Sequence, residues 1–334
     1  MAIADRARNV DSYVGFARET VWGEDSIAAY YAPLLSQNLG HARPIIKSNA
    51  ALGIRYTQQF IQGIIDPNSG GWSAEIWQDE FAPLVAWALG ADSVAGASDV
   101  ATHTISRGAT LPSVTVRKGV DVEEHVYPGL KINTFNLNVS GAGAIPTYDV
   151  AGFSKAHVNN ETVATPSFTT QNAFAGHNVA VYLDAEDTTR ASTVTQYFPT
   201  SVTMSVNNNI EAPNVPLGNF QIREEPTEGE LVITGTLVFD TFDESTNNSA
   251  TLFDNYKNFT AMSLRIAFAG SGVVQNRRNI DCYFPRILFT DGVPNSSGKT
   301  GPIPITMNWM AFYSVARATE GQFVFQDQVI TAYV

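Results

Sequence analysis

Two stretches of the sequence, residues 127–153 and 284–312, carry the same landmarks in the same order. Each opens with an aromatic residue and a proline, continues as an apolar run, crosses a Gly-rich turn and resumes at an Ile-Pro pair: Tyr127-Pro128 and Ile145-Pro146 in the first, Phe284-Pro285 and Ile303-Pro304 in the second. Within each copy the two prolines are separated by a similar distance, 146 − 128 = 18 residues in the first copy and 304 − 285 = 19 residues in the second. Self-similarity at a fixed spacing constrains a fold more than any local pattern, because it predicts one structural unit used twice.

The similarity extends toward the N-terminus with a nearly constant offset. Tyr31-Ala32-Pro33 matches Tyr197-Phe198-Pro199 at 199 − 33 = 166, and Leu52-Gly53 matches Leu217-Gly218 at 218 − 53 = 165, against 285 − 128 = 157 further along. The pattern therefore predicts a tandem duplication. We divide the chain into an N-terminal arm (1–12), a first β-barrel repeat (13–154), a linker (155–171) and a second repeat with a C-terminal strand or arm (172–334).

Alternating apolar residues predict that both repeats consist mainly of strands. Val202, Met204 and Val206 alternate with polar neighbours, as in a half-buried strand. Along residues 130–139 the apolar positions change parity, which predicts a β-bulge or barrel corner because successive side chains lie on opposite faces. The expected fold class is mainly β, with two tandem β-barrel or sandwich repeats, each flanked by one short α-helix.

The two helices are predicted from apolar residues at helical spacing. Residues 80–90 have acidic residues at the start and Gly90 as a terminator, and the second helix follows the polar residues 247–249. The side chains expected to pack these helices on the sheets are Phe81, Leu84, Val85 and Leu89 in the first and Leu252, Phe253 and Tyr256 in the second.

Composition excludes several classes of function. The 334 residues include 20 Lys and Arg against 32 Asp and Glu, a formal net charge of −12, which argues against sequence-specific nucleic-acid binding. The single cysteine, Cys282, cannot form an internal disulfide and is expected in a strand of the core. Residues 1–10 lack the apolar segment of a secretory signal, and no apolar run has the roughly 20 residues needed to span a bilayer. We therefore expect a soluble protein made in a cytoplasm.

No pattern in the sequence predicts an enzyme, a metal site or a bound cofactor. The five histidines are scattered and no two have the i, i+4 spacing of a helical zinc site. The acidic segments 184–187 and 240–244 lack the glycine and terminal glutamate of a calcium loop, and we interpret them as solvated turns. Gly141-Ala142-Gly143 lies between strands and does not open a helix, so it predicts a turn and no phosphate site.

The N-terminal part of the chain resembles a known family. Gly15-Phe16-Ala17-Arg18-Glu19-Thr20, followed by Trp22-Gly23 and Tyr31-Ala32-Pro33, is similar to the N-terminal signature of tail tube proteins of long-tailed bacteriophages. The helix ending at Gly90 and the segment from Tyr127 to Phe135 are similar to the central region of that family. The resemblance implies a β-barrel or sandwich, with a flanking helix, that assembles into stacked rings forming the conduit for ejected viral DNA. It also implies location in the virion tail, after assembly in the cytoplasm of the bacterial host.

The resemblance also implies the number of subunits, because versions of the family with one unit form six-membered rings, whereas doubled versions form three-membered rings with pseudo-sixfold symmetry. We therefore expect homotrimeric rings, with a homohexamer as the alternative. Such a ring needs a head-to-tail interface that closes, and exposed sheet edges can supply it. The connections 51–71 and 213–229 exceed ordinary loop length, so we expect them to contact the next ring. The candidate contacts between subunits or rings are Arg55, Tyr56, Asp66, Arg223, Glu224, Glu225 and Glu228. The other expected partners are the tape measure protein and viral DNA in the lumen, without sequence-specific binding, and other tail proteins at the tube ends; no membrane is expected. The acidic excess predicts a net-negative bore to which DNA does not adhere.

Two other classes of function fit parts of the pattern. A virion decoration or fibre protein has a similar β-rich composition, but it would lack the duplication and would not form tubes. A secreted carbohydrate-binding module or glycosidase would use exposed aromatic residues or two carboxylates in one cleft. The aromatic residues here lie within alternating apolar strands, which favours a role in the core.

Overall fold

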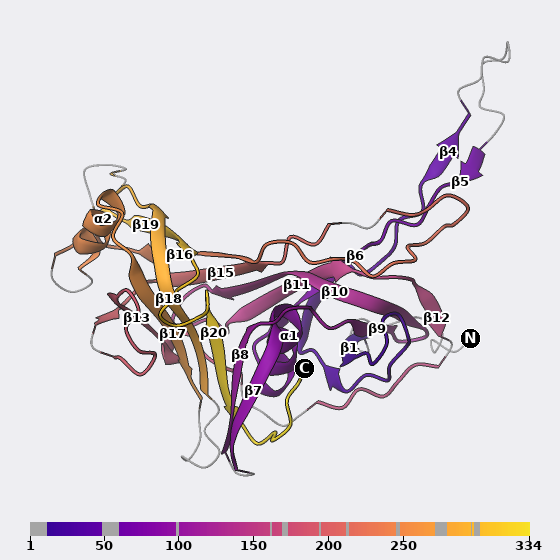
Figure 1. Ribbon diagram of the computed structural model, residues 1–334, viewed down its shortest axis with the longest axis horizontal. Coiled ribbons are helices and arrows are strands. Elements are labelled where there is room, and N and C mark those ends of the chain that lie inside the picture. Colours follow the sequence, from indigo (N-terminus) through magenta and orange to yellow (C-terminus); the bar gives the residue numbers. More distant parts are fainter. Residues whose placement is uncertain are drawn as a thin grey trace, which may run out of the picture.

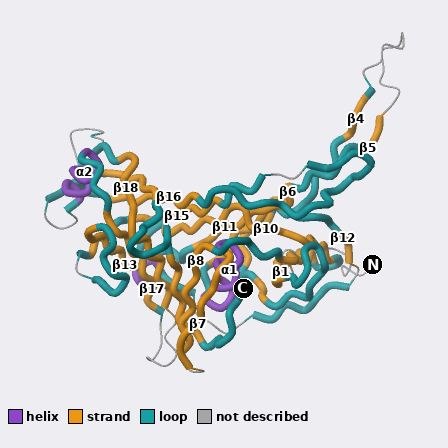
Figure 2. Tube along the Cα trace, viewed as in Figure 1, coloured by secondary structure: helices purple, strands orange, loops and turns teal. Residues whose placement is uncertain are grey.

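The structure is a computed structural model that describes residues 12–48, 60–97, 100–160, 162–168, 173–193, 195–211, 214–244, 248–270, 279–294, 296 and 301–334. The fold is mainly β, with a large antiparallel sheet and two α-helices in the described part of the chain, and is consistent with a β-sandwich or barrel-like architecture (Figure 1). Figure 2 shows that strands form most of the body. The predicted mainly β class is confirmed.

Eight strands from both halves of the chain form one continuous antiparallel sheet, which we call the long sheet. In spatial order they are β3 (Leu34–Gln37), β6 (Asn68–Glu75), β11 (Thr147–Phe153), β10 (Glu124–Val139), β15 (Ser201–Asn207), β16 (Val232–Phe239), β19 (Ile305–Ala311) and β18 (Asn279–Asp291). Four strands come from each half, and the pairing of β10 with β15 joins the halves. In Figure 1 this sheet extends from β18 and β19 on the left to β6 on the right.

The remaining strands of the body extend from the first parts of the long strands β10 and β18. On β10 they are β9 (Val114–Val120), then β1 (Ser12–Arg18) and β2 (Tyr30–Tyr31), with β12 (Val158–Asn160) on the other side. On β18 they are β17 (Met262–Ala269), then β13 (Val179–Ala185) and β14 (Gln196–Tyr197), with β20 (Gln322–Asp327) on the other side. β20 also pairs with β8 (Val100–Arg107), which forms a hairpin with β7 (Gly90–Ala97). A short 3-10 helix, Gly176–Asn178, precedes β13.

The pairings of the two halves follow the same order and have irregularities in the same places. The ladder with β9 shifts register beside Pro128, between Tyr127 and Leu130, and the ladder with β17 shifts beside Pro285. A second shift follows Ile132 in β10 and Phe289 in β18. A proline has no N–H to donate to a ladder, so the first pair of shifts, beside Pro128 and Pro285, is the expected consequence. The bulge predicted within residues 130–139 is confirmed.

The two helices differ in how deeply they are buried. Helix α1 (Gln78–Leu89) ends at Gly90, whose φ of 91° is in the left-handed region, and almost all of its residues are buried. The ring of Phe81 lies 5.5 Å from that of Phe135 and 5.8 Å from that of Phe325, so α1 packs against strands of both halves. Helix α2 (Ser249–Lys257) lies at one end of the molecule and buries only Ser249 and Leu252 fully (Figure 1).

A buried ion-pair network fixes the C-terminal segment on the first half of the chain. Nδ1 of His103 lies 2.8 Å from Asp92 Oδ2, and its Nε2 lies 3.3 Å from Asp327 Oδ1. Burial alone lowers the pKa of His103, but its hydrogen bonds to Asp327 and Asp92 outweigh that effect and raise the pKa to about 10. The ring of Tyr333 stacks on His103 at 4.5 Å, and the carbonyl of Tyr333 accepts a hydrogen bond from the Trp87 indole. The last residues are therefore part of the body.

A two-stranded hairpin projects from the body, and we call it the arm. It consists of β4 (Ile45–Lys47) and β5 (Phe60–Gln62), and Figure 1 shows it extending away from the end of the long sheet that carries β6. All six of its strand residues are exposed, including the apolar Ile45, Ile46, Phe60 and Ile61. The strands of the arm bury none of their side chains. A two-stranded hairpin without such burial is at best marginally stable in water.

Candidate functional site

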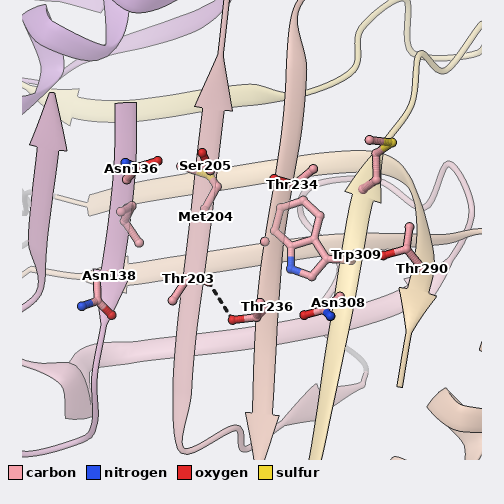
Figure 3. A pocket seen from close by; sticks show the side chains of 13 residues that line it. Asn136, Asn138, Thr203, Met204, Ser205, Thr234, Thr236, Thr290, Asn308 and Trp309 are labelled. Atoms are coloured by element: carbon pink, nitrogen blue, oxygen red, sulfur yellow. Dashed lines mark hydrogen bonds between the residues drawn. The ribbon is translucent and has the colours of Figure 1, made fainter. Parts of the chain in front are cut away.

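One face of the long sheet forms a groove lined by uncharged polar side chains. The groove has a volume of about 500 Å³ and runs across β10, β15, β16 and β19. Figure 3 shows Asn136, Thr203, Ser205, Thr236 and Asn308 projecting from adjacent strands on this face. The hydroxyls of Thr203 and Thr236 are 2.7 Å apart and form a hydrogen bond between β15 and β16. These side chains alternate with buried apolar ones, so the opposite face of the same strands is the core.

A second groove continues the same face across the first half of the chain. It has a volume of about 450 Å³, shares Asn136 with the first, and is lined by residues of β3, β6, β10 and β11 and by the start of the segment after β3. Asp149 is the only charged residue among the described residues that line the two grooves, and no lysine or arginine lines either of them. The face offers uncharged amide and hydroxyl groups and no lysine or arginine to form an ion pair with a phosphate.

The two end strands of the long sheet have edges that no described strand covers. β3 pairs with β6 on one side only. The last part of β18, near Phe289 and Asp291, pairs with β19 on one side, while its pairing with β17 on the other side ends at Ile287. An exposed strand edge is a template for pairing with another chain. Here one such edge lies at each end of the sheet.

Comparison with known proteins identifies the chain on independent grounds. A family model described as phage tail tube protein matches residues 9–311. The chain belongs to the phage tail tube protein family. It is therefore a structural component of a phage virion tail, and the family is not an enzyme class. A comparison with curated proteins gives no match.

The predicted contact residues of this tail tube protein occupy different surroundings. Asp66, Arg223 and Glu224 are exposed, and they remain predicted contacts between subunits or rings. Arg55 and Tyr56 lie outside the described residues. Glu225 and Glu228 bind Nζ of the buried Lys131 within the same chain, at 2.9 and 2.6 Å.

Glu228 is thereby part of an internal contact that sequence reasoning missed. Its carboxylate also accepts a hydrogen bond from the amide of Leu111. Burial opposes ionisation of Glu228, but the hydrogen bonds from Lys131 and from the Leu111 amide are stronger and lower its pKa. The segment around residue 228 is held on the body by this contact.

The residues predicted to pack the helices lie where the helices meet the core. Phe81, Leu84, Val85 and Leu89 of α1 and Leu252 of α2 are buried. Phe253 and Tyr256 are partly buried against the core. Cys282 is buried in β18, as predicted for a cysteine in a strand of the core.

Three histidines that are scattered in the sequence, His41, His125 and His157, lie close together in the tail tube protein. Nδ1 of His125 lies 3.0 Å from Nε2 of His157, and the ring of His157 stacks on those of Tyr127 and His41. Burial lowers the pKa of His41 and of His157, and the neighbouring His125 lowers the pKa of His157 further. Pairing of β10 with β12 brings His125 near His157, and no short spacing in the sequence could reveal this.

The part of the chain that the structure describes also bears on metal binding and on membrane spans. No group of three or more His, Cys, Asp or Glu side chains there is arranged to hold a metal ion. None of the helices there is long and apolar enough to cross a membrane.

Proposed function

We propose that the chain forms closed rings of three subunits that stack into the phage tail tube, through which viral DNA is ejected. A tandem duplication of one β-rich unit underlies this arrangement. The main support for the proposal is the strand order of the long sheet, in which β3, β6, β11 and β10 are followed by β15, β16, β19 and β18. The second four strands repeat the pairing order of the first four.

This order leads to a ring because the sheet is not terminated at either end. The step from the first half to the second joins β10 to β15, and the same step repeated from the second half would join β18 to the β3 of another chain. A head-to-tail contact of this kind closes when the rotation per step divides a full turn. Three chains with two units each give six steps, and this is why we favour three subunits over the alternative of six.

The grooved face of the long sheet is the surface that we assign to the bore. Duplex DNA carries one charge per about 1.7 Å of its axis, and lysine or arginine side chains would bind it. A surface of threonine, serine and asparagine gives the phosphates no cationic partner. Release of the DNA would then depend on the absence of positive charge in the lining, whereas the net charge of the chain suggested repulsion by a negative one.

The arm and the segment after residue 213 are the parts that we assign to contacts between rings. Exposed apolar residues on a projecting hairpin would be a liability in an isolated subunit, and they mark a surface that another protein covers. Leu217 and Phe220 are also exposed, and the carbonyl of Phe220 accepts a hydrogen bond from the amide of Ile65 at the base of the arm. The two segments therefore form one apolar surface for a subunit of the next ring. The tape measure protein and viral DNA would occupy the lumen, and other tail proteins the ends.

Electron microscopy of the purified protein tests the proposal. We expect hollow tubes with stacked striations in negative stain, assembled from protein expressed in a bacterial cytoplasm. Monomers or solid fibres at concentrations at which other tail tube proteins polymerise would contradict it, and fibres would favour a decoration or fibre protein.

A further inference from the structure

The junction between β10 and β15 is a contact between two β-units that can be read residue by residue. Thr134 to Val139 pair with Asn207 to Val202 without a register shift. The amide of Asn208 donates to the carbonyl of Asn133, which continues the same register. In an antiparallel pair, hydrogen-bonded positions alternate with non-bonded ones. Phe135 and Leu137 are therefore bonded across the junction, and Asn136 lies opposite Ser205 in a non-bonded pair.

The register shifts identify the residues of the open edges that correspond to this junction. Ile132 and Phe289 precede equivalent shifts, so β18 follows β10 at an offset of 289 − 132 = 157. In the pairing of β3 with β6, Gln37 lies opposite Trp72, and in the equivalent pairing of β15 with β16, Val202 lies opposite Leu237. β15 therefore follows β3 at an offset of 202 − 37 = 165. With these offsets, Asn136 corresponds to Val293 and Ser205 to Gly40.

We propose that residues 291–294 of one chain pair in antiparallel register with residues 39–42 of a second copy, and that this seam closes the ring. The inference rests on the proposed function and names the edges that meet. Gly292 lies opposite His41 in a hydrogen-bonded pair, and Val293 lies opposite Gly40 in a non-bonded pair. The seam is a strand addition in which each chain supplies one edge to each neighbour.

The main-chain hydrogen bonds of residues 38–42 agree with this register. The amides of Asn38 and Gly40 donate to the carbonyls of Gly71 and Ser69, so these residues face β6. By alternation, the main-chain groups of Leu39 and His41 face the open side. They are the positions that the register pairs with Pro294 and Gly292.

The local chemistry at Leu39 also fits the proposed partner. Pro294 has no N–H to donate, so it leaves the carbonyl opposite without a main-chain partner. That carbonyl belongs to Leu39, and it accepts a hydrogen bond from Nζ of Lys118 at 3.0 Å within its own chain. The seam is therefore short and ends at Pro294.

The difference between the two helices is a second, independent observation. Helix α1 is covered by the second half of the chain, because Phe81 packs on Phe325 and Gln78 donates to the carbonyl of Gln326. Helix α2 occupies the equivalent place in the second half, yet Phe253 and Tyr256 are only partly buried, and Phe259 just after it is 80% exposed. In the ring, the first half of the next chain lies beside α2 as the second half lies beside α1.

Cysteine cross-linking tests the seam in assembled tubes. Directly opposite residues of a non-bonded pair have Cα atoms about 4.5 Å apart, within the range of about 4.4–6.8 Å that a disulfide spans. A Cβ at Gly40 would have no atom within 4 Å, and Val293 is exposed, so G40C/V293C should fold. The native Cys282 is buried, and burial raises the pKa of its thiol, which keeps background reaction low.

The expected result is that mild oxidation of G40C/V293C tubes converts monomer into a covalent three-chain species on a non-reducing gel. A mixture of the two single variants should give two-chain species only, because each chain then carries one half of the seam. The matched control is G40C/T290C, in which the second cysteine is displaced by three residues, or about 10 Å. It should not cross-link.

The outcomes separate the seam from the function on which it rests. Tubes that form without cross-links, or that cross-link equally in the control, would overturn the seam and leave the tube intact. Wild-type protein that forms no rings would contradict the proposed function itself. If the double variant fails to fold, hydrogen exchange of the wild type decides. The amides of His41 and Gly292 should exchange roughly 10-fold or more slowly in tubes than in monomers, and unchanged rates would overturn the seam.

Discussion

The neutral lining of the grooved face gives a prediction that charge substitution can test. Thr236 projects into the groove from β16, and its hydroxyl forms a hydrogen bond with that of Thr203. A lysine at this position would place one ammonium group per chain on the face, and hence three in each proposed ring. We expect T236K tubes to bind duplex DNA that wild-type tubes let pass, because the new cations give the phosphates partners.

The size of the effect follows from counterion release. Each phosphate that a lysine neutralises adds about 0.9 to the slope of log affinity against log salt. Raising the salt fourfold, from about 50 to about 200 mM, should then weaken binding about 3.5-fold for one contact and about 40-fold for the three contacts of one ring. Wild-type tubes should show no retention over this range.

The assay measures retention of short fluorescent duplexes by purified tubes at a series of salt concentrations. The matched control is V315K, which adds the same charge on an exposed turn between β19 and β20. If T236K tubes retained no more DNA than V315K tubes, the assignment of the grooved face to the bore would be wrong.

Three further predictions concern the body and the arm. The pKa of His103 in the folded protein lies above its unfolded value of about 6.5, so its contribution to the free energy of unfolding is complete below pH 6.5 and is lost as the pH rises toward about 10. Urea unfolding should show this decline. The variant H103N leaves the two buried carboxylates without their cation, so it should lower the free energy of unfolding by about 3–5 kcal/mol at pH 7 and remove the decline. The pKa of His157 is lowered in the folded protein, so the free energy of unfolding should fall as the pH drops below about 6.5 and the unfolded chain takes up the proton. The stability of H157N should fall less in acid. An unchanged loss of stability in acid would contradict a role for His157. The double variant F60S/I61S replaces two exposed apolar side chains of the arm. We expect an unchanged unfolding midpoint and single rings in place of tubes, and normal tubes would show that the arm is not the contact between rings.

Local patterns predicted the parts of the fold that depend on nearby residues. The apolar stripe of residues 80–90 predicted α1, and Gly90 ends it because it can adopt the left-handed conformation. The change of parity after Ile132 predicted the bulge of β10, since each residue added to one strand turns the following side chains to the other face.

The candidate site depends on distant residues, and the sequence could predict only its outline. The approach of His125 and His157 and the capture of Glu228 by Lys131 result from strand pairing and loop packing across long separations. The net charge of the chain predicted an acidic bore, and this stays a prediction. Net charge is an average over all surfaces, and the grooved face that we propose as the bore is almost uncharged. The edges of the long sheet were expected to pair with neighbours, and the proposal of which residues pair needed the registers that the structure shows within one chain.

A reconstruction of the assembled tube by electron cryomicroscopy would show whether three chains close a ring through one continuous sheet. We expect three chains per ring, with density for a continuous inner wall of eight strands from each chain and with the side chain of Thr236 facing the lumen. Six chains per ring, or an inner wall broken between residues 291–294 and 39–42 of neighbouring chains, would contradict it.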